Sequence, residues 1–177
     1  MLPARRGAWR LLHDSACDGG VKHAKFHELC DGKGARVPPR PPPNHLHIGK
    51  RARAGHTVVV LKDKKGSIYG GYIDGVWQTK GFGTSDDAFM FCLASCEAPA
   101  AAPFKMPLNG TDNKHAIYGY AGCGAQFGGG PDFKVESDGH VTNKIGHTYT
   151  PGPLGATISG VARVAVESLE VWQLAEA

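Results

Sequence analysis

The clearest indication of architecture is the stretch at residues 55–94, GHTVVVLKDKKGSIYGGYIDGVWQTKGFGTSDDAFMFCLA. Thr57–Leu61 is rich in β-branched residues, which is typical of a buried strand. Asp63–Gly66 has the composition of a hairpin turn with a left-handed glycine at its end, and Ser67–Ile73 returns as the partner strand. The sequence therefore predicts an antiparallel hairpin at this point of the chain.

The end of the same stretch predicts a strand with two apolar faces. Phe89, Phe91 and Leu93 alternate with Met90 and Cys92, so that one set points to each side of a strand. A strand that is apolar on both faces is typical of a sheet packed between two layers.

Further strands are indicated on both sides of this stretch. Apolar or alternating residues predict strands at 9–13, 115–120 and 133–136, and Asp138 with Gly139 forms a turn after the last of these. The glycine run Gly128–Gly130 is interpreted as a bend where a sheet turns a corner.

Two segments have sequence patterns that fit a helix. Val21–Cys30 is expected to be a short helix, because Phe26, Leu29 and Cys30 are spaced i, i+3 and i+4. Residues 161–174 fit either a helix or a strand that changes phase near Ser168, and their valine content favours a bulged strand.

Length and composition agree with a single mainly β domain. The chain has 177 residues, of which 41% are hydrophobic and 25 are glycine. This length supports one sizeable core, and so many glycines indicate many turns. We therefore predict a mainly β (α+β) fold over residues 1–177, a sandwich of two antiparallel sheets with a few short flanking helices.

The basic charge is concentrated in residues 35–56, which contain five prolines and no acid. Removing the five Lys and Arg residues of this segment from the net charge of +4 leaves the rest of the chain at −1. The composition predicts a disordered or polyproline II loop, either a true insertion or translated intron sequence. Since the segment has no aromatic residue, nucleic-acid binding is not expected. Arg36, Pro39 and Pro42 match a basic SH3 ligand pattern.

Compartment is suggested by the cysteines and the N-terminus. The five thiols, with no secretory leader in the sequence, are expected to be reduced in the cytoplasm. The Arg-rich start, MLPARRGAWRLL, leaves mitochondrial import as the alternative. No apolar run approaches the ~20 residues that cross a membrane, so membrane insertion is not expected.

Residues with possible chemistry do not form a recognisable set. His23 and His27, with Cys17 and Cys30, could face one metal, but surface histidines on an amphipathic helix explain them better, and no metal or cofactor is expected. Gly128–Gly130 lacks the Lys-Ser/Thr of a phosphate loop.

The remaining catalytic candidates are thiols and one carboxylate. Cys92, Cys96 and Cys123 could supply a thiolate. Glu170, which lies between Leu169 and Val171, could act as a base with a raised pKa, satisfy backbone N–H groups at a bulge or face solvent.

Five blocks of sequence, in order, resemble the TLDc domain family. They are residues 11–34, 57–77 (with Gly-Gly-Tyr), 86–93, 125–135 with GHTY at 146–149, and LEVWQL at 169–174. Residues 35–56 depart from the family, in which the chain passes almost directly to the hairpin. Pro131 replaces a polar residue that is more usual there. The positions that carry the family motif are Gly70, Gly71, Tyr72, Trp77, Phe89, Phe91, Gly128, Gly129, Gly130, Asp132, Glu170 and Trp172.

The resemblance implies a two-sheet sandwich, makes 161–174 a strand, and links the chain to oxidative-stress resistance and to the vacuolar proton-pumping ATPase (V-ATPase). The family has no agreed catalytic residues and no known cofactor. The leading hypothesis is thus a non-enzymatic interaction module that binds a protein, plausibly a V-ATPase subunit. The alternatives are a thiol-based peroxide-reactive protein or an uncharacterised hydrolase-like enzyme, and an adaptor that uses the Pro-rich loop at 36–43.

Overall fold

A computed structural model describes residues 9–14, 56–78, 80–110, 113–120 and 124–174. Its elements are β1 (Trp9–Asp14), β2 (Thr57–Asp63), β3 (Ile68–Ile73), β4 (Lys80–Gly83), β5 (Phe89–Ala94), β6 (Phe104–Pro107), the 3₁₀ turn η1 (Asn113–His115), β7 (Ile117–Tyr120), β8 (Gln126–Phe127), β9 (Phe133–Val135), β10 (His140–Asn143) and β11 (Arg163–Leu174). The expected helix at Val21–Cys30 and the basic segment at 35–55 lie outside the described residues.

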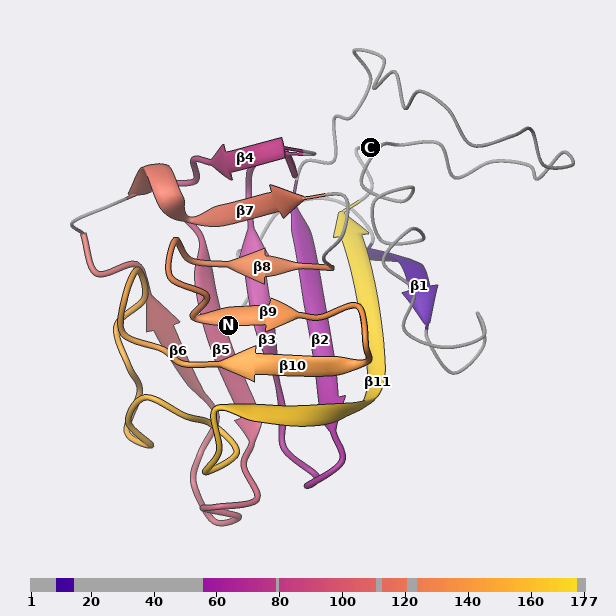
Figure 1. Cartoon of the computed structure of the whole chain (residues 1–177), viewed down its shortest axis with the longest axis vertical. Helices are drawn as coiled ribbons and strands as arrows, with labels where there is room; N and C mark the ends of the chain where they lie inside the picture. Colours follow the sequence, from indigo (N-terminus) through magenta and orange to yellow (C-terminus); the bar gives the residue numbers. More distant parts are fainter. Residues whose placement is uncertain (1–8, 15–55, 79, 111–112, 121–123, 175–177) are drawn as a thin grey trace, which may run out of the picture.

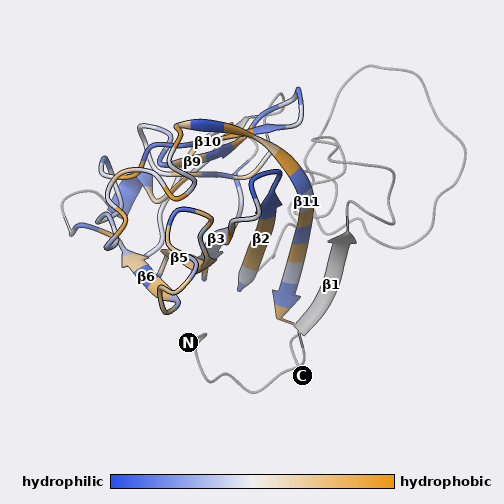
Figure 2. Cartoon of the chain, turned by 90° about the horizontal axis from the view of Figure 1, so that it is seen from below, coloured by the Kyte–Doolittle hydropathy of each residue, from blue (hydrophilic) through white to orange (hydrophobic). Residues whose placement is uncertain are grey.

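The strands form one continuous antiparallel sheet that folds into two layers. The pairing order is β4-β7-β8-β9-β10-β11-β2-β3-β5-β6, and β1 pairs with β11. Layer A contains β1, the end of β11, β2, β3, β5 and β6, and layer B contains β4, β7, β8, β9 and β10 with the start of β11. In Figure 1 the layer B strands run across those of layer A, and Figure 2 shows the layers one above the other. The mainly β two-layer prediction is confirmed, whereas the described residues contain only η1 as a helical element.

The strand β11 joins the layers, and an irregularity within it makes this possible. Residues Arg163–Ala165 pair with β10, and Val166–Gln173 pair with β2. The pairing register with β2 shifts between Val166 and Ser168. Such a shift bends a strand and changes which side chains point inward. The bulged strand predicted for 161–174, with its phase change near Ser168, is confirmed.

Glycines set two of the turns, and one glycine run is placed differently from the prediction. The β2–β3 hairpin turns at Gly66, which has a φ of +95° and donates its N–H to the Asp63 carbonyl at 3.0 Å. Gly139 turns the chain between β9 and β10 with a φ of +79°. The run Gly128–Gly130 lies in the connection between β8 and β9, two paired strands of the same layer. It is therefore a hairpin connection and not the corner of a sheet.

The core lies between the layers and combines aliphatic with aromatic side chains. Phe127 on β8 is fully buried and packs edge-on against Trp77 and Phe133, with ring centroids 5.4 and 5.7 Å away. Gly71 on β3 makes this approach possible, because a Cβ there would lie 2.4 Å from the Phe127 ring. Because Gly71 of layer A has no side chain, it leaves a space that Phe127 of layer B fills.

Candidate functional site

The family-motif residues of layer A divide between its two faces. Gly71 faces layer B, and the loop residue Trp77 is buried in the same core. Tyr72, Phe89, Phe91 and Trp172 belong instead to a separate cluster on the outer face. Gly70 lies beneath that cluster, since a Cβ there would meet the Phe91 ring at 3.1 Å and the Val59 carbonyl oxygen at 1.9 Å. The same motif therefore builds both faces of one sheet.

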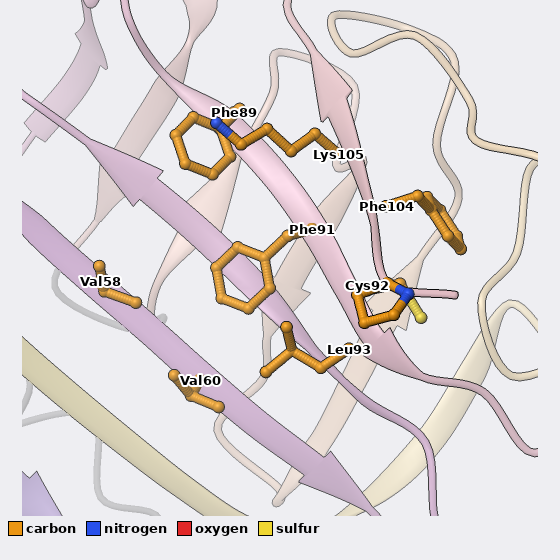
Figure 3. Close-up of a pocket in the computed structure, with 9 residues that line it drawn as sticks. Val58, Val60, Phe89, Phe91, Cys92, Leu93, Phe104 and Lys105 are labelled. Carbon is orange, nitrogen blue, oxygen red and sulfur yellow. The ribbon is translucent and has the colours of Figure 1, made fainter. Parts of the chain in front are cut away.

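The outer cluster lines an apolar groove of about 270 Å³, called here the outer groove. Figure 3 shows its sides: Phe89, Phe91 and Leu93 from β5, and Val58 and Val60 from β2. Between these strands, Gly70 stands opposite Val60 and Phe91 and contributes no side chain, which leaves the groove open. Lys105 stands at one end, with its Nζ 4.0 Å above the centre of the Phe89 ring. Among the residues that the structure describes, the groove thus has apolar walls and one cation, Lys105.

The motif residues of layer B build a second feature, the Gly-loop platform, defined as residues 128–132 and 146–148. Asp132 is fully buried, and its carboxylate accepts the N–H groups of Gly146 (2.7 Å), His147 (2.9 Å) and Thr148 (3.1 Å). A buried carboxylate with three backbone donors is strongly held. Asp132 therefore fixes one loop of the platform to the other.

Two more hydrogen bonds tie the glycines into the platform. The N–H of Gly129 donates to Thr148 Oγ1 at 2.9 Å, and the N–H of Gly130 donates to His147 Nδ1 at 3.1 Å. His147 Nδ1 must be unprotonated to accept that bond, so the ring carries its proton on Nε2. The rest of the His147 side chain is exposed beside Lys144, and both line a cavity of about 520 Å³.

The catalytic candidates are not brought together. Glu170 lies on the outer face, in register with Val60, and its Oε2 accepts the indole N–H of Trp172 at 2.8 Å. This contact is neither the backbone role nor the solvent-facing role considered from the sequence. Cys92 is buried, and burial raises the pKa of its thiol to about 11. Cys123 lies outside the described residues.

Of the two described thiols, Cys96 is the one that a reagent in solution can reach. It is half-buried, and its Sγ lies 3.7 Å from Glu97 Oε1. The Lys65 ammonium binds the same carboxylate at 3.0 Å. The hydrogen bond and charge of Lys65 lower the pKa of Glu97. If the protein has thiol chemistry among its described cysteines, the structure favours Cys96 over Cys92.

A buried polar cluster nearby was not predicted from the sequence. The Asp63 carboxylate accepts the N–H groups of Lys65 (2.9 Å) and Ser67 (3.0 Å) and the hydroxyl of Ser159. Lys65 Nζ in turn donates to the Ser159 carbonyl at 2.6 Å. Asp63 and Ser159 are fully buried, so Ser159 is inaccessible to a substrate in this arrangement. The cluster connects the β2–β3 turn to the loop before β11, and its signal in sequence was only the Asp of a turn.

Several other predicted sites lie in the part of the chain before β2. His23, His27, Cys17, Cys30 and the Pro39/Pro42 pattern lie outside the described residues. Within the described residues, no group of three or more His, Cys, Asp or Glu side chains could hold a metal. The same part of the chain contains no helix of the length and hydropathy needed to span a bilayer.

Fold and site together define a two-layer antiparallel β domain whose motif residues build a packed interface, an outer groove and a rigid loop platform. The model of the TLDc domain family matches residues 46–175, well over half of the chain, and the protein belongs to that family. A search of curated proteins finds no match to this chain. The first block of the resemblance, at 11–34, precedes the matched range, although β1, which overlaps the start of this block, pairs with β11.

Proposed function

We propose that this TLDc domain is a non-enzymatic docking module that binds a protein partner through the Gly-loop platform. The observation that carries the proposal is the Asp132 carboxylate, which holds Gly146, His147 and Thr148 in place by three hydrogen bonds. The loops are thereby organised before any partner arrives, and pre-organisation lowers the entropic cost of binding. His147 and Lys144 remain exposed at the rim and supply polar contacts.

The partner proposed is a V-ATPase subunit, on the grounds of the family link. Resistance to oxidative stress is then an indirect result of regulating the pump in the cytoplasm, and no chemistry on peroxide is required. The platform and its rim offer a partner two donors of different kinds, the His147 Nε2–H of the platform and the Lys144 ammonium of the rim. An acidic or carbonyl-rich segment of a subunit would complement them.

The test is binding of the purified domain to intact V-ATPase and to its detached catalytic sector. We expect Lys144→Glu combined with His147→Ala to weaken binding by at least about 30-fold, which corresponds to the loss of about 2 kcal/mol that defines a hot spot. Lys80→Glu is the matched control, because Lys80 is also an exposed lysine of layer B but lies on β4. Equal binding by all three proteins would exclude the platform as the binding site. No binding by the folded unmodified domain would exclude V-ATPase as the partner.

A deletion separates this proposal from the adaptor alternative. A chain lacking residues 35–56 should bind V-ATPase as well as the full chain does, since the platform lies in layer B. Loss of binding on deletion, in protein that still unfolds cooperatively, would favour the Pro-rich segment as the contact.

A further inference from the structure

One hydrogen bond of the Gly-loop platform depends on the protonation state of its acceptor. The N–H of Gly130 donates to His147 Nδ1 at 3.1 Å, and this nitrogen also lies 3.2 Å from Thr148 Oγ1. A backbone N–H can only donate, so Nδ1 must present its lone pair to Gly130. The N–H of the neighbouring Gly129 donates instead to Thr148 Oγ1, a hydroxyl that does not titrate. Adjacent glycines are therefore held by a titratable and a non-titratable acceptor.

The His147 ring lies directly on the glycine that it holds. A Cβ at Gly130 would lie 2.9 Å from the Cγ and Cδ2 atoms of that ring. The backbone of His147 is fixed separately, because its N–H donates to Asp132 at 2.9 Å and its carbonyl accepts Asn109 Nδ2 at 2.8 Å. Protonation of the ring would thus break the contact with Gly130 while the loop that carries His147 stays anchored.

The charged and titratable groups around His147 come from three parts of layer B. His115 of η1 approaches across the glycine run, since a Cβ at Gly129 would meet His115 Cβ at 3.0 Å and His147 Cε1 at 3.6 Å. Lys144 of the rim lines the same cavity as His147. Both groups oppose an added positive charge. The buried Asp132 carboxylate favours one, but its oxygens already accept three backbone N–H groups.

We propose that His147 is a pH switch that sets the order of the Gly-loop platform. The neutral ring holds Gly130, whereas the imidazolium carries a proton on Nδ1 and releases it. The order of the platform is complete above the titration of His147 and is lost as pH falls through the histidine range, about pH 8 to 5. Nε2–H is a donor in both states, so the group that titrates acts on the platform itself.

This inference rests on the proposed docking function and adds its regulation. A platform that loses order must be reorganised by its partner, which costs affinity. Docking is therefore expected to weaken in acid. For a proton-pumping ATPase, the transported ion would then control the binding of the regulator.

The order of the platform is tested on the full chain alone by ¹H–¹⁵N NMR from about pH 8 to about pH 5.5. The amide proton of Gly130 should move upfield with the same midpoint as the His147 ring signals, because its hydrogen bond is lost. The Gly129 amide, which has the Thr148 acceptor, is the internal control and should move much less. A Gly130 amide that stays in place while the His147 ring titrates would overturn the proposal.

Matched variants assign the titration to one of the two neighbouring histidines. The side-chain oxygen of His147→Asn can accept the Gly130 N–H and does not titrate, so the Gly130 signal should become independent of pH. His115→Asn removes the other imidazole and should leave the shift of Gly130 unchanged. Persistence of the shift in His147→Asn, or its loss in His115→Asn, would overturn the assignment to His147.

Binding to V-ATPase at about pH 7.5 and about pH 6 tests the regulation. The unmodified chain and His115→Asn should bind about threefold to tenfold more weakly at the lower pH, the equivalent of one lost hydrogen bond. His147→Asn should show the same affinity at both pH values, whatever that affinity is. Tighter binding by the unmodified chain in acid would overturn the proposal, since it would show that the charge of His147 outweighs its lone pair. Absence of binding at either pH would overturn the docking function, and the Gly130 titration would still decide the switch.

Discussion

The two faces of β2, β3 and β5 carry the same kinds of side chain but are stabilised in different ways. On the inner face, Phe127 of layer B enters the space left by Gly71 and is surrounded on all sides. On the outer face, Phe91 lies over Gly70 within its own sheet and borders an open groove. Two adjacent glycines thus serve opposite purposes. Gly71 lets the two layers approach each other, and Gly70 leaves a groove open on the outer face.

The largest expected effect is on the inner face, from Phe127→Ala. The variant loses the transfer free energy of a buried ring and leaves a cavity among Trp77, Phe133 and Tyr149. The expected destabilisation is about 3–5 kcal/mol. Urea unfolding followed by tryptophan fluorescence measures it. Phe82→Ala is the control, because Phe82 is 45% exposed and its loss should cost much less. Similar losses for both would contradict the described core.

A smaller effect is expected on the outer face, from Phe91→Ala. The ring is 8% exposed, yet it borders the groove, so its removal enlarges an existing space and does not open an enclosed cavity. The transfer free energy of the ring alone suggests a loss of stability of about 2 kcal/mol. The same urea experiment sharpens the contrast between the faces. A loss equal to that of Phe127→Ala would mean that the outer face is as tightly enclosed as the inner one.

A third and weaker effect concerns Glu170 on the outer face. Glu170→Gln keeps an oxygen that can accept the Trp172 indole N–H, and it removes only the charge. The expected loss is about 0.5–1 kcal/mol. Glu167→Gln is the matched control, since Glu167 is exposed on the same strand and pairs with Lys62 at 3.1 Å. A gain in stability from Glu170→Gln would show that the charge is poorly accommodated and would revive its interpretation as a base.

Sequence reasoning recovered the elements with strong local patterns. Val164 and Val166, then Leu169 and Val171, predicted the phase change of β11 because side-chain direction alternates along a strand. The short strands β4, β6, β8 and β10 were not predicted, since they have two to four residues each and contain glycine, proline or polar residues. Their pairing depends on neighbours that are distant in sequence.

Sequence reasoning identified residues of the site but did not predict how they are arranged in space. Asp132 was identified as a motif position, but its three donors lie 14 to 16 residues further along the chain. Only the return of the loop after β10 brings them together, and local sequence carries no signal of that contact. The outer groove was hidden for a similar reason. Alternation showed that both faces of β5 are apolar, whereas the position of layer B decides which face is left open.

The reactivity of Cys92 is the most direct test of which face its thiol occupies. Of the predicted effects, this one changes the fold least. Burial raises the pKa of its thiol to about 11, so that at pH 8 the group is protonated as well as inaccessible. Iodoacetamide should label Cys96 and spare Cys92 in the native protein, and it should label both in urea. Peptide mass spectrometry separates the two sites. Labelling of native Cys92 would mean that β5 is more open than described.

The same pKa shift has a consequence for stability. In the unfolded chain the Cys92 thiol loses its proton near its ordinary pKa of 9.0, whereas the folded protein retains it to about 11. Stability contributed by the neutral thiol is therefore complete below pH 9 and falls as the pH rises from 9 to 11. Cys92→Ala should lack this part of the decline in Tm, and Cys96→Ser should retain it. Parallel Tm curves for Cys92→Ala and the unmodified chain over this range would show that the Cys92 environment does not favour the neutral thiol.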